Sequence, residues 1–210
     1  MISLSSFDAL IFDFGGVILN IDFELTIKAF QRIGILFPHT YTLKENGNNL
    51  FVEFEKGTIS PERFRNEIRW QSGLKRNDFK IDHAWNALLQ HTTSERIDLL
   101  MKLKEKTRLF LLSNSNRIHY DKYVPQINSA FSIDFIKLFE KTYFSFNLKL
   151  LKPSQEIYQY VIDKQSLNPE RTLFIDDSIA NIEGAQAVGL QTYWLKVEED
   201  ICDLFDLDSN

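Results

Sequence analysis

Four groups of polar side chains, three of them at the ends of short apolar runs, could together carry out phosphoryl transfer. A free carboxylate such as that of Asp13 can attack a phosphorus atom and form an aspartyl-phosphate. The adjacent pair Asp176 and Asp177 could help to hold Mg²⁺, which binds few carboxylates together with water and phosphate oxygens. The hydroxyl of Ser113 and the ammonium of Lys152 could then bind the remaining phosphate oxygens.

Taken singly, each of these groups has an ordinary structural explanation. An aspartate after a strand often caps a helix or lies in a turn, Ser113-Asn114 is typical of a turn, and a lysine before proline is commonly a solvated loop charge. The pair Asp176-Asp177 is harder to explain in this way, because two adjacent carboxylates repel each other unless a cation compensates them. The chemistry is therefore indicated by the combination of groups.

Short apolar runs lead into three of these groups and are expected to be buried strands. Apolar strands that end in small, polar or acidic residues are typical of a parallel sheet with a site along its carboxyl edge. The runs are 9–12, 109–112 and 173–175, with a further candidate strand at 192–195.

Helical spacing fills the segments between these strands. Pro153 is expected to stand in the first turn of a helix that turns Ile157, Tyr160 and Val161 inward. Alternating strands and helices predict right-handed crossovers, and therefore an α/β fold with a doubly wound parallel sheet.

The stretch 21–89 departs from this alternation. It contains no convincing strand, but Phe23, Ile27 and Phe30 share a helical face, and Ser60-Pro61 is a helix-start signal. We therefore expect a helical insertion over 21–89 between the first strand and the rest of the sheet.

Composition narrows the class of protein. The chain has 210 residues, of which 44% are hydrophobic and 25% charged, so it can bury a sizeable core. A net charge of -5 without a basic run makes nucleic acid a poor partner. The single cysteine, Cys202, cannot form an internal disulfide, and the four histidines lack zinc-type spacing. No apolar run approaches the roughly 20 residues of a membrane span, and the N-terminus lacks signal-peptide features. We expect a cytoplasmic protein, a monomer or weak dimer, that binds a small metabolite.

Four segments, in their order along the chain, resemble the four motifs of the haloacid dehalogenase-like superfamily. The resemblance spans residues 8 to about 196, and the combination is far more specific than any single motif. The segments are 11–17 (IFDFGGV), 112–114 (LSN), 152–153 (KP), and 174–177 (FIDD) with Asn181, Gly184-Ala185 and Gly189.

The resemblance implies a Rossmann-like catalytic core, formed by 1–20 and 90–210, with a helical cap inserted after the first motif. This agrees with the helical insertion expected over 21–89. It also implies a phosphatase that uses Mg²⁺ and acts on a small phosphorylated metabolite such as a sugar phosphate.

The resemblance further assigns roles to single residues. Asp13 would be the nucleophile, and Lys152 would act with it. The transferring phosphoryl group would be held by Ser113, Asn114 and Lys152. The metal ligands would be Asp13, the carbonyl of Gly15, and Asp177, with Asp176 behind them or bound through water.

Finer features are similar to the bacterial branch that includes α-D-glucose-1-phosphate phosphatase. They are the segments 15–22 (GGVILNID), 56–60 (KGTIS) and 113–119 (SNSNRIH).

Gly15 is a departure from most phosphatases of the superfamily, which carry a second aspartate at this position as general acid and base. Such catalysis typically contributes roughly 10²–10⁴-fold. The branch named above also carries glycine here, and an anomeric leaving oxygen needs less protonation than an alcohol. Asp22 is a candidate substitute, although a role as N-cap of a helix over 23–33 is favoured.

The loop before Lys152 also departs from the family, because it lacks the glycine that often precedes the lysine. Lys149 therefore competes as the phosphate-binding lysine, and Lys152 is favoured because Pro153 and the following helix fix its position.

Three functions remain open on the sequence. The first is the Mg²⁺-dependent phosphatase. The second is a 2-haloacid dehalogenase, which also lacks the second aspartate but does not use an acidic pair such as Asp176-Asp177. The third is a non-enzymatic or weakly active protein that binds a phosphate ligand, and Gly15 is its only support.

Overall fold

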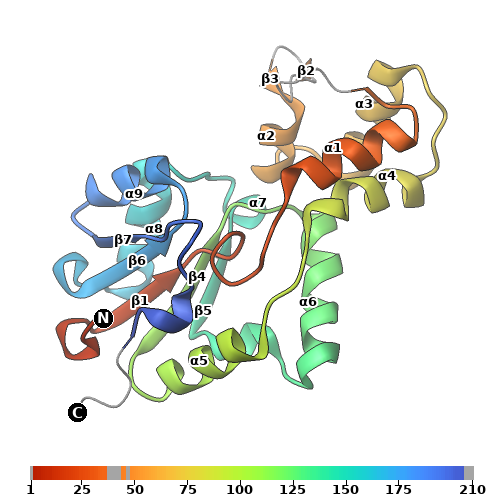
Figure 1. Cartoon of the computed structure of the whole chain (residues 1–210). Helices are drawn as coiled ribbons and strands as arrows, with labels where there is room; N and C mark the ends of the chain where they lie inside the picture. The colour runs from red at the N-terminus through yellow and green to blue at the C-terminus, as the bar shows by residue number, and fades with distance from the viewer. Residues whose placement is uncertain (1, 37–43, 46–47, 206–210) are drawn as a thin grey trace.

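A parallel sheet of five strands forms the centre of the computed structural model, which describes residues 2–36, 44–45 and 48–205 (Figure 1). The strand order is β5-β4-β1-β6-β7. The strands are β1 (Ala9–Phe12), β4 (Arg108–Ser113), β5 (Lys141–Phe144), β6 (Thr172–Asp176) and β7 (Gln191–Trp194). The α/β fold with a doubly wound parallel sheet is thus confirmed, and β5 is an addition to the predicted strands.

Helices connect the strands and also build the inserted segment. Short 3-10 turns occupy Leu4–Ser6, Asn86–Leu88, Phe135–Leu138, Pro169–Arg171 and Ile201–Asp203. The α-helices are α1 (Phe23–Arg32), α2 (Leu50–Glu55), α3 (Pro61–Ser72), α4 (Asp78–Trp85), α5 (Ser94–Lys104), α6 (Arg117–Phe131), α7 (Ser145–Leu148), α8 (Gln155–Gln165) and α9 (Ile179–Gln186).

Both faces of the sheet are covered, which explains why β1 is apolar at every position. Leu10 and Phe12 pack into the core that α5 and α6 complete. Ala9 and Ile11 pack on the other face, with α8 and α9. A strand buried on both sides reads as a continuous apolar run, because successive side chains point to opposite faces.

The central position of β1 brings the candidate residues together. Phe12 pairs with Leu111 of β4 on one side and with Ile175 of β6 on the other. Asp13, Ser113 and Asp176 therefore emerge at the same carboxyl edge. The chain leaves β1 and returns on both of its sides, so this edge is the topological switch point, where ligands bind in open α/β sheets.

Helices α1–α4 form a separate layer above α6 and α7 (Figure 1). They have their own apolar core, in which the rings of Phe54 and Phe64 stack with centroids 4.2 Å apart. The chain enters and leaves this layer side by side, through a bridge between Ile21 and Leu89. Two strands of two residues, β2 (Lys44–Glu45) and β3 (Asn48–Asn49), pair here, so the prediction of a strand-free insertion was wrong in this detail.

The inward face of α8 also differs from the prediction. Ile157 and Val161 are fully buried as expected, but Tyr158 takes the third place and Tyr160 is only half-buried. Among the described residues, no helix is long and apolar enough to cross a membrane.

Candidate active site

Asp13 follows β1 directly and is held at the sheet edge by its backbone. Its N–H donates to the carbonyl of Ile175 at 2.9 Å, which continues the pairing of β1 with β6. The residue is only 8% exposed. Its Oδ1 lies 2.7 Å from the Nζ atom of Lys152. The sheet therefore delivers a buried carboxylate to the edge and pairs it with a cation.

Lys152 lies between Asp13 and Asp176 and contacts both. Its Nζ lies 2.7 Å from Asp13 Oδ1 and 2.7 Å from Asp176 Oδ2, and the residue is 4% exposed. Burial alone would lower the pKa of this lysine, but the attraction of Asp13 and Asp176 outweighs burial and raises its pKa. Lys152 is therefore held as a buried ammonium, which suits the binding of phosphate oxygens.

Asn114 fixes the backbone of this lysine. Its Nδ2 donates to the carbonyl of Lys152 at 2.9 Å, and its Oδ1 accepts from the N–H of Lys152 at 3.0 Å. Ser113, at the end of β4, is 2% exposed, and its hydroxyl donates to the carbonyl of Asn114 at 3.3 Å. Asn114 thus positions the lysine, and contacts of Ser113 and Asn114 with a phosphoryl group stay predictions.

Lys149 lies elsewhere. It is exposed, adopts a left-handed backbone with φ of 62°, and donates from Nζ to the carbonyl of Gly57. Of the two competing lysines, Lys152 is the one that contacts Asp13. The structure therefore favours the choice of Lys152.

Asp176 is completely buried and its oxygens are fully engaged. Besides Lys152, it accepts from the Nδ2 of Asn181 at 2.9 and 3.1 Å and from the N–H of Ser178 at 2.8 Å. Asp177 is exposed at the surface of the cluster. These contacts fit Asp176 as the inner, orienting carboxylate and Asp177 as the accessible one.

Trp194 holds Asp177 in place and was not among the predicted site residues. Its indole Nε1 donates to the carbonyl of Asp177 at 3.0 Å. Its place at the strand end could have indicated this, because Trp194 ends β7 and pairs with Asp176. The rule that residues at strand ends share one edge would have found it.

Three carboxylates meet here, because ligand oxygens of Asp13, Asp176 and Asp177 lie within 4.8 Å of one another. Burial and the charge of Asp176 raise the pKa of Asp13 to about 7 against the opposing pull of Lys152. Burial, and secondly Asp176, raise the pKa of Asp177. With all three ionised, Lys152 leaves two negative charges uncompensated.

A divalent cation with a preference for oxygen fits this donor set, and Mg²⁺ is the cofactor that it suits. Asp13, Asp177 and the carbonyl of Gly15 would hold the ion, with Asp176 behind them. When bound, Mg²⁺ supplies positive charge to the oxygens of a transferring phosphoryl group. The charge excess of the cluster is the structural reason to expect it.

Two adjacent glycines in the loop after Asp13 differ in their constraints. Gly16 has φ of +78°, and a Cβ atom built on it would lie 2.1 Å from Oδ2 of Asp177. Gly15 is not left-handed, and its Cβ would lie 3.2 Å from Cδ1 of Ile21. The metal-side carboxylate therefore packs directly against Gly16.

Asp22 caps α1, as the sequence favoured. Its side chain accepts from the N–H of Glu24 at 2.9 Å. This bond commits one of its oxygens to the helix start.

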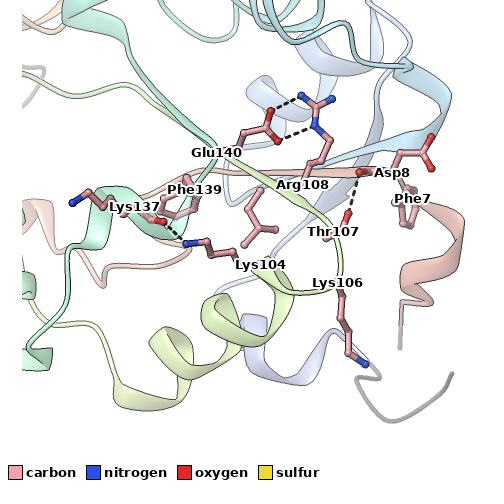
Figure 2. A pocket seen from close by; sticks show the side chains of 10 residues that line it. Phe7, Asp8, Lys104, Lys106, Thr107, Arg108, Lys137, Phe139 and Glu140 are labelled. Carbon is pink, nitrogen blue, oxygen red and sulfur yellow. Dashed lines mark hydrogen bonds and ion pairs between the residues drawn. The ribbon is translucent and has the colours of Figure 1, made fainter.

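A hollow lies at the opposite edge of the sheet, where β1 and β4 begin (Figure 2). Its volume is about 720 Å³. Several of its polar groups contact one another: Arg108 pairs with Glu140 at 2.6 Å, and Thr107 donates to the carbonyl of Asp8. None of the predicted site residues lines it, so its size does not make it the active site.

Comparison with known proteins decides the family. A model of haloacid dehalogenase-like hydrolases matches residues 7–189. The chain belongs to this family. It is 28% identical over 184 residues to D-ribitol-5-phosphate phosphatase of Bacteroides thetaiotaomicron, covering 88% of this chain and 89% of that protein. It is 23% identical to a phosphorylated carbohydrates phosphatase of Thermotoga maritima, covering 88% of this chain and 82% of that protein.

Solved structures agree. A haloacid dehalogenase family enzyme of Bacteroides thetaiotaomicron, in complex with magnesium and inorganic phosphate, superposes with a TM-score of 0.88 at 37% identity, covering 95% of this chain and 100% of that one. The L-2-haloacid dehalogenase of Xanthobacter autotrophicus shares the fold at 17% identity, with a TM-score of 0.58 and 90% and 77% of the two chains covered. The finer likeness to α-D-glucose-1-phosphate phosphatase stays a prediction.

Proposed function

We propose that this protein is a Mg²⁺-dependent phosphatase that hydrolyses a small phosphorylated metabolite through a phosphorylated Asp13. The single observation that carries the proposal is the position of Lys152 Nζ, 2.7 Å from both Asp13 and Asp176, beside Asp177. A nucleophile, a phosphate-binding cation and metal-binding carboxylates are thereby combined in one cluster at the switch point of the sheet.

The reaction has two displacements at phosphorus. In the first, an oxygen of Asp13 attacks, the bond between phosphorus and the leaving oxygen breaks, and that oxygen takes a proton. In the second, water attacks the phosphorus of the aspartyl-phosphate, the bond to Asp13 breaks, and phosphate and a proton are released. Lys152 and Ser113 hold the oxygens of the phosphoryl group in both steps.

Gly15 shapes the range of substrates. No carboxylate stands at this position to protonate the leaving oxygen, so the site favours leaving groups that depart as stable anions. Sugar phosphates whose phosphate is attached at the anomeric oxygen meet this requirement better than phosphates of simple alcohols. The relatives named for D-ribitol-5-phosphate and for phosphorylated carbohydrates support a polyhydroxylated substrate, but ribitol carries its phosphate on a primary alcohol, so they do not bear on the anomeric attachment.

Helices α1–α4 are proposed to act as the cap over residues 21–89, with 1–20 and 90–210 as the catalytic core. Their separate apolar core and the paired entry and exit at Ile21 and Leu89 support this division. A cap of this kind would close over the carboxyl edge and contact the leaving group.

The test is a screen of sugar phosphates, other phosphate monoesters and halogenated acids, each with and without Mg²⁺. Release of inorganic phosphate that requires Mg²⁺ is expected. Release of halide without metal would identify a dehalogenase instead. Binding of phosphate esters without turnover of any of them would identify a ligand-binding protein and contradict the proposal.

A further inference from the structure

Ser145, the first residue of α7, has a hydroxyl that joins three segments of the chain. The residue is completely buried. Its Oγ accepts from the N–H of Ser115 at 3.0 Å and donates to the carbonyl of Glu55 at 2.6 Å. The carbonyl of Ser115 lies 3.1 Å from the same oxygen. One hydroxyl therefore links the residue after β5 to the segment after β4 and to the last residue of α2.

The segment that Ser145 holds carries candidate phosphate-binding residues. Ser115 follows Ser113 and Asn114 directly, and the side chain of Asn114 makes two hydrogen bonds with the backbone of Lys152. The groups of Ser115 that contact Ser145 belong to its backbone, so the contact fixes the course of the chain. A displacement of Ser115 would therefore move Ser113 directly and reach Lys152 through Asn114.

The sheet register explains why Ser145 reaches this segment. Ser113 pairs with Phe144 at the carboxyl ends of β4 and β5, so the residues that follow the two strands emerge side by side. At the other end of the segment, Asn116 caps α6 by accepting from the N–H of His119 at 3.0 Å. Ser145 therefore holds the backbone between two fixed points.

The contact with α2 sets the direction of the Ser145 hydroxyl. A hydroxyl has one proton, and the carbonyl of Glu55 is the nearer of its two acceptors. That carbonyl is itself held in place, because α2 approaches α7 and a Cβ atom on the following Gly57 would clash with the carbonyl oxygen of Phe146 (Figure 1). With its proton directed at Glu55, the oxygen of Ser145 presents a lone pair to the N–H of Ser115.

We propose that Ser145 is a positioning residue for phosphoryl transfer, whose hydroxyl holds the backbone of Ser115 and thereby sets the positions of Ser113 and Asn114. It acts through these residues and does not itself bind the phosphoryl group. The inference rests on the proposed function and adds a residue to the same site.

The phosphate-binding and metal-binding parts of the site should respond differently to loss of this hydroxyl. Ser145→Ala would deprive the buried N–H of Ser115 of its partner, which is costly unless the backbone shifts to find another. Such a shift would move Ser113 relative to the phosphoryl oxygens. Asp13 and Asp177 follow other strands, β1 and β6, and should keep their places.

The experiment compares Ser145→Ala with Thr172→Val as a matched control. Thr172 is also buried, and its hydroxyl donates to the carbonyl of Asn168 at 2.8 Å, but it begins β6 at the opposite edge of the sheet. Both variants lose a buried hydrogen bond, so both should melt at a lower temperature. The readouts are kcat for p-nitrophenyl phosphate per folded enzyme, and the Kd values of Mg²⁺ and of inorganic phosphate at saturating Mg²⁺ by calorimetry.

In Ser145→Ala, kcat is expected to fall about 10–100-fold, because a misplacement of about 1 Å can cost roughly 10²-fold. Inorganic phosphate should bind about tenfold more weakly, the loss expected for one hydrogen bond to a charged group. The Kd of Mg²⁺ should keep its native value. Thr172→Val should keep the native value of all three quantities. If Ser145→Ala does not fold, Ser145→Cys replaces it, because a thiol fills the place of the hydroxyl but is a weak donor and acceptor.

Native kcat and native phosphate affinity in the Ser145 variant would overturn the inference. Equal losses in Thr172→Val would also overturn it, because they would show a role in stability alone, and so would an equal weakening of Mg²⁺ and phosphate binding. A native enzyme that hydrolyses no phosphate ester would contradict the proposed function, whereas the comparison of phosphate affinities would still test the role of Ser145.

Discussion

Gly16→Ala is the substitution for which the structure predicts the clearest effect on the proposed metal site. A Cβ atom there would lie 2.1 Å from Oδ2 of Asp177, and separations below 3.0 Å are sterically excluded. The carboxylate must therefore retreat by roughly 1 Å, whereas Mg²⁺ requires its ligands at about 2.0–2.1 Å in near-octahedral geometry. A shift of this size removes Asp177 as a direct ligand.

Two separate losses should follow. The left-handed backbone at Gly16 costs a residue with a side chain about 1–2 kcal/mol. For a chain of this length, such a loss lowers the melting temperature by roughly 2–8 °C. Displacement of the carboxylate should weaken Mg²⁺ binding by about 10–100-fold, the range typical of disturbed metal sites. Turnover at low Mg²⁺ should fall in proportion, and high Mg²⁺ should restore part of it.

Gly15→Ala is the matched control, because it adds the same methyl group one residue earlier. The backbone at Gly15 is not left-handed, and its Cβ would meet only the flexible end of Ile21 at 3.2 Å. Calorimetric titration of Mg²⁺ and thermal melts of both variants, without and with the metal, separate the two losses. If Gly16→Ala binds Mg²⁺ as tightly as the native protein does, the position assigned to Asp177 as a metal ligand is wrong.

Four further predictions concern Asp13, the two competing lysines, Glu55 and the leaving group. Asp13→Asn should abolish phosphate release and leave the melting temperature in Mg²⁺-free buffer within a few degrees of the native value; substantial turnover would mean that another group attacks phosphorus. Lys152→Ala should reduce turnover strongly and weaken inhibition by inorganic phosphate, whereas Lys149→Ala should have the smaller effect; the reverse order in steady-state kinetics would show that the wrong lysine was chosen. Burial raises the pKa of Glu55 from 4.5 to about 7, so folding binds a proton between these values and stability falls as pH rises through this window. In denaturant titrations, the free energy of unfolding of Glu55→Gln should therefore exceed that of the native protein at pH 8 but not at pH 4. A gain independent of pH would show that the raised pKa of Glu55 is not its cause. In a rate series of phosphate esters, turnover should depend steeply on the basicity of the leaving group, and Gly15→Asp should reduce that dependence; a flat series in the native enzyme would show that another acid already serves.

The meeting of the candidate site residues at one edge could be predicted because it follows from strand ends. Asp13 and Asp176 directly follow or end apolar strands, and a parallel sheet brings such ends to one edge. The same rule, applied to the strand candidate at 192–195, reaches Trp194. What it cannot supply is which side chains bond to one another after they have reached that edge.

The pairing of Asn114 with Lys152 illustrates this limit. The two residues are 38 positions apart and their bonds join a side chain to a backbone. Neither residue type nor spacing signals such a contact, and the usual role of an amide beside a phosphate site suggests a ligand contact instead.

Strand β5, the length of α6 and the inward face of α8 could not be predicted from local sequence patterns. Strand β5 begins with Lys141 and Thr142, an edge-strand pattern whose apolar part is only two residues long. Helix α6 is interrupted in sequence by Pro125, which normally ends a helix, yet the structure carries the helix through it to Phe131. In α8, Tyr158 and Tyr160 are equivalent by residue type, and only packing against Phe174 selects Tyr158 for the core, with ring centroids 5.4 Å apart.

The missing acid at Gly15 bears directly on the range of substrates. Ile21 lies beside the space that a side chain at position 15 would enter, so an apolar contact stands next to the leaving oxygen's usual acid position. Asp22 already caps α1 and is exposed, so it is poorly placed to replace that acid. Water must then protonate the leaving oxygen. We therefore expect faster hydrolysis of substrates whose leaving group departs readily. Affinity for such a leaving group must then come from contacts other than a side chain at position 15, and those contacts need not take part in proton transfer.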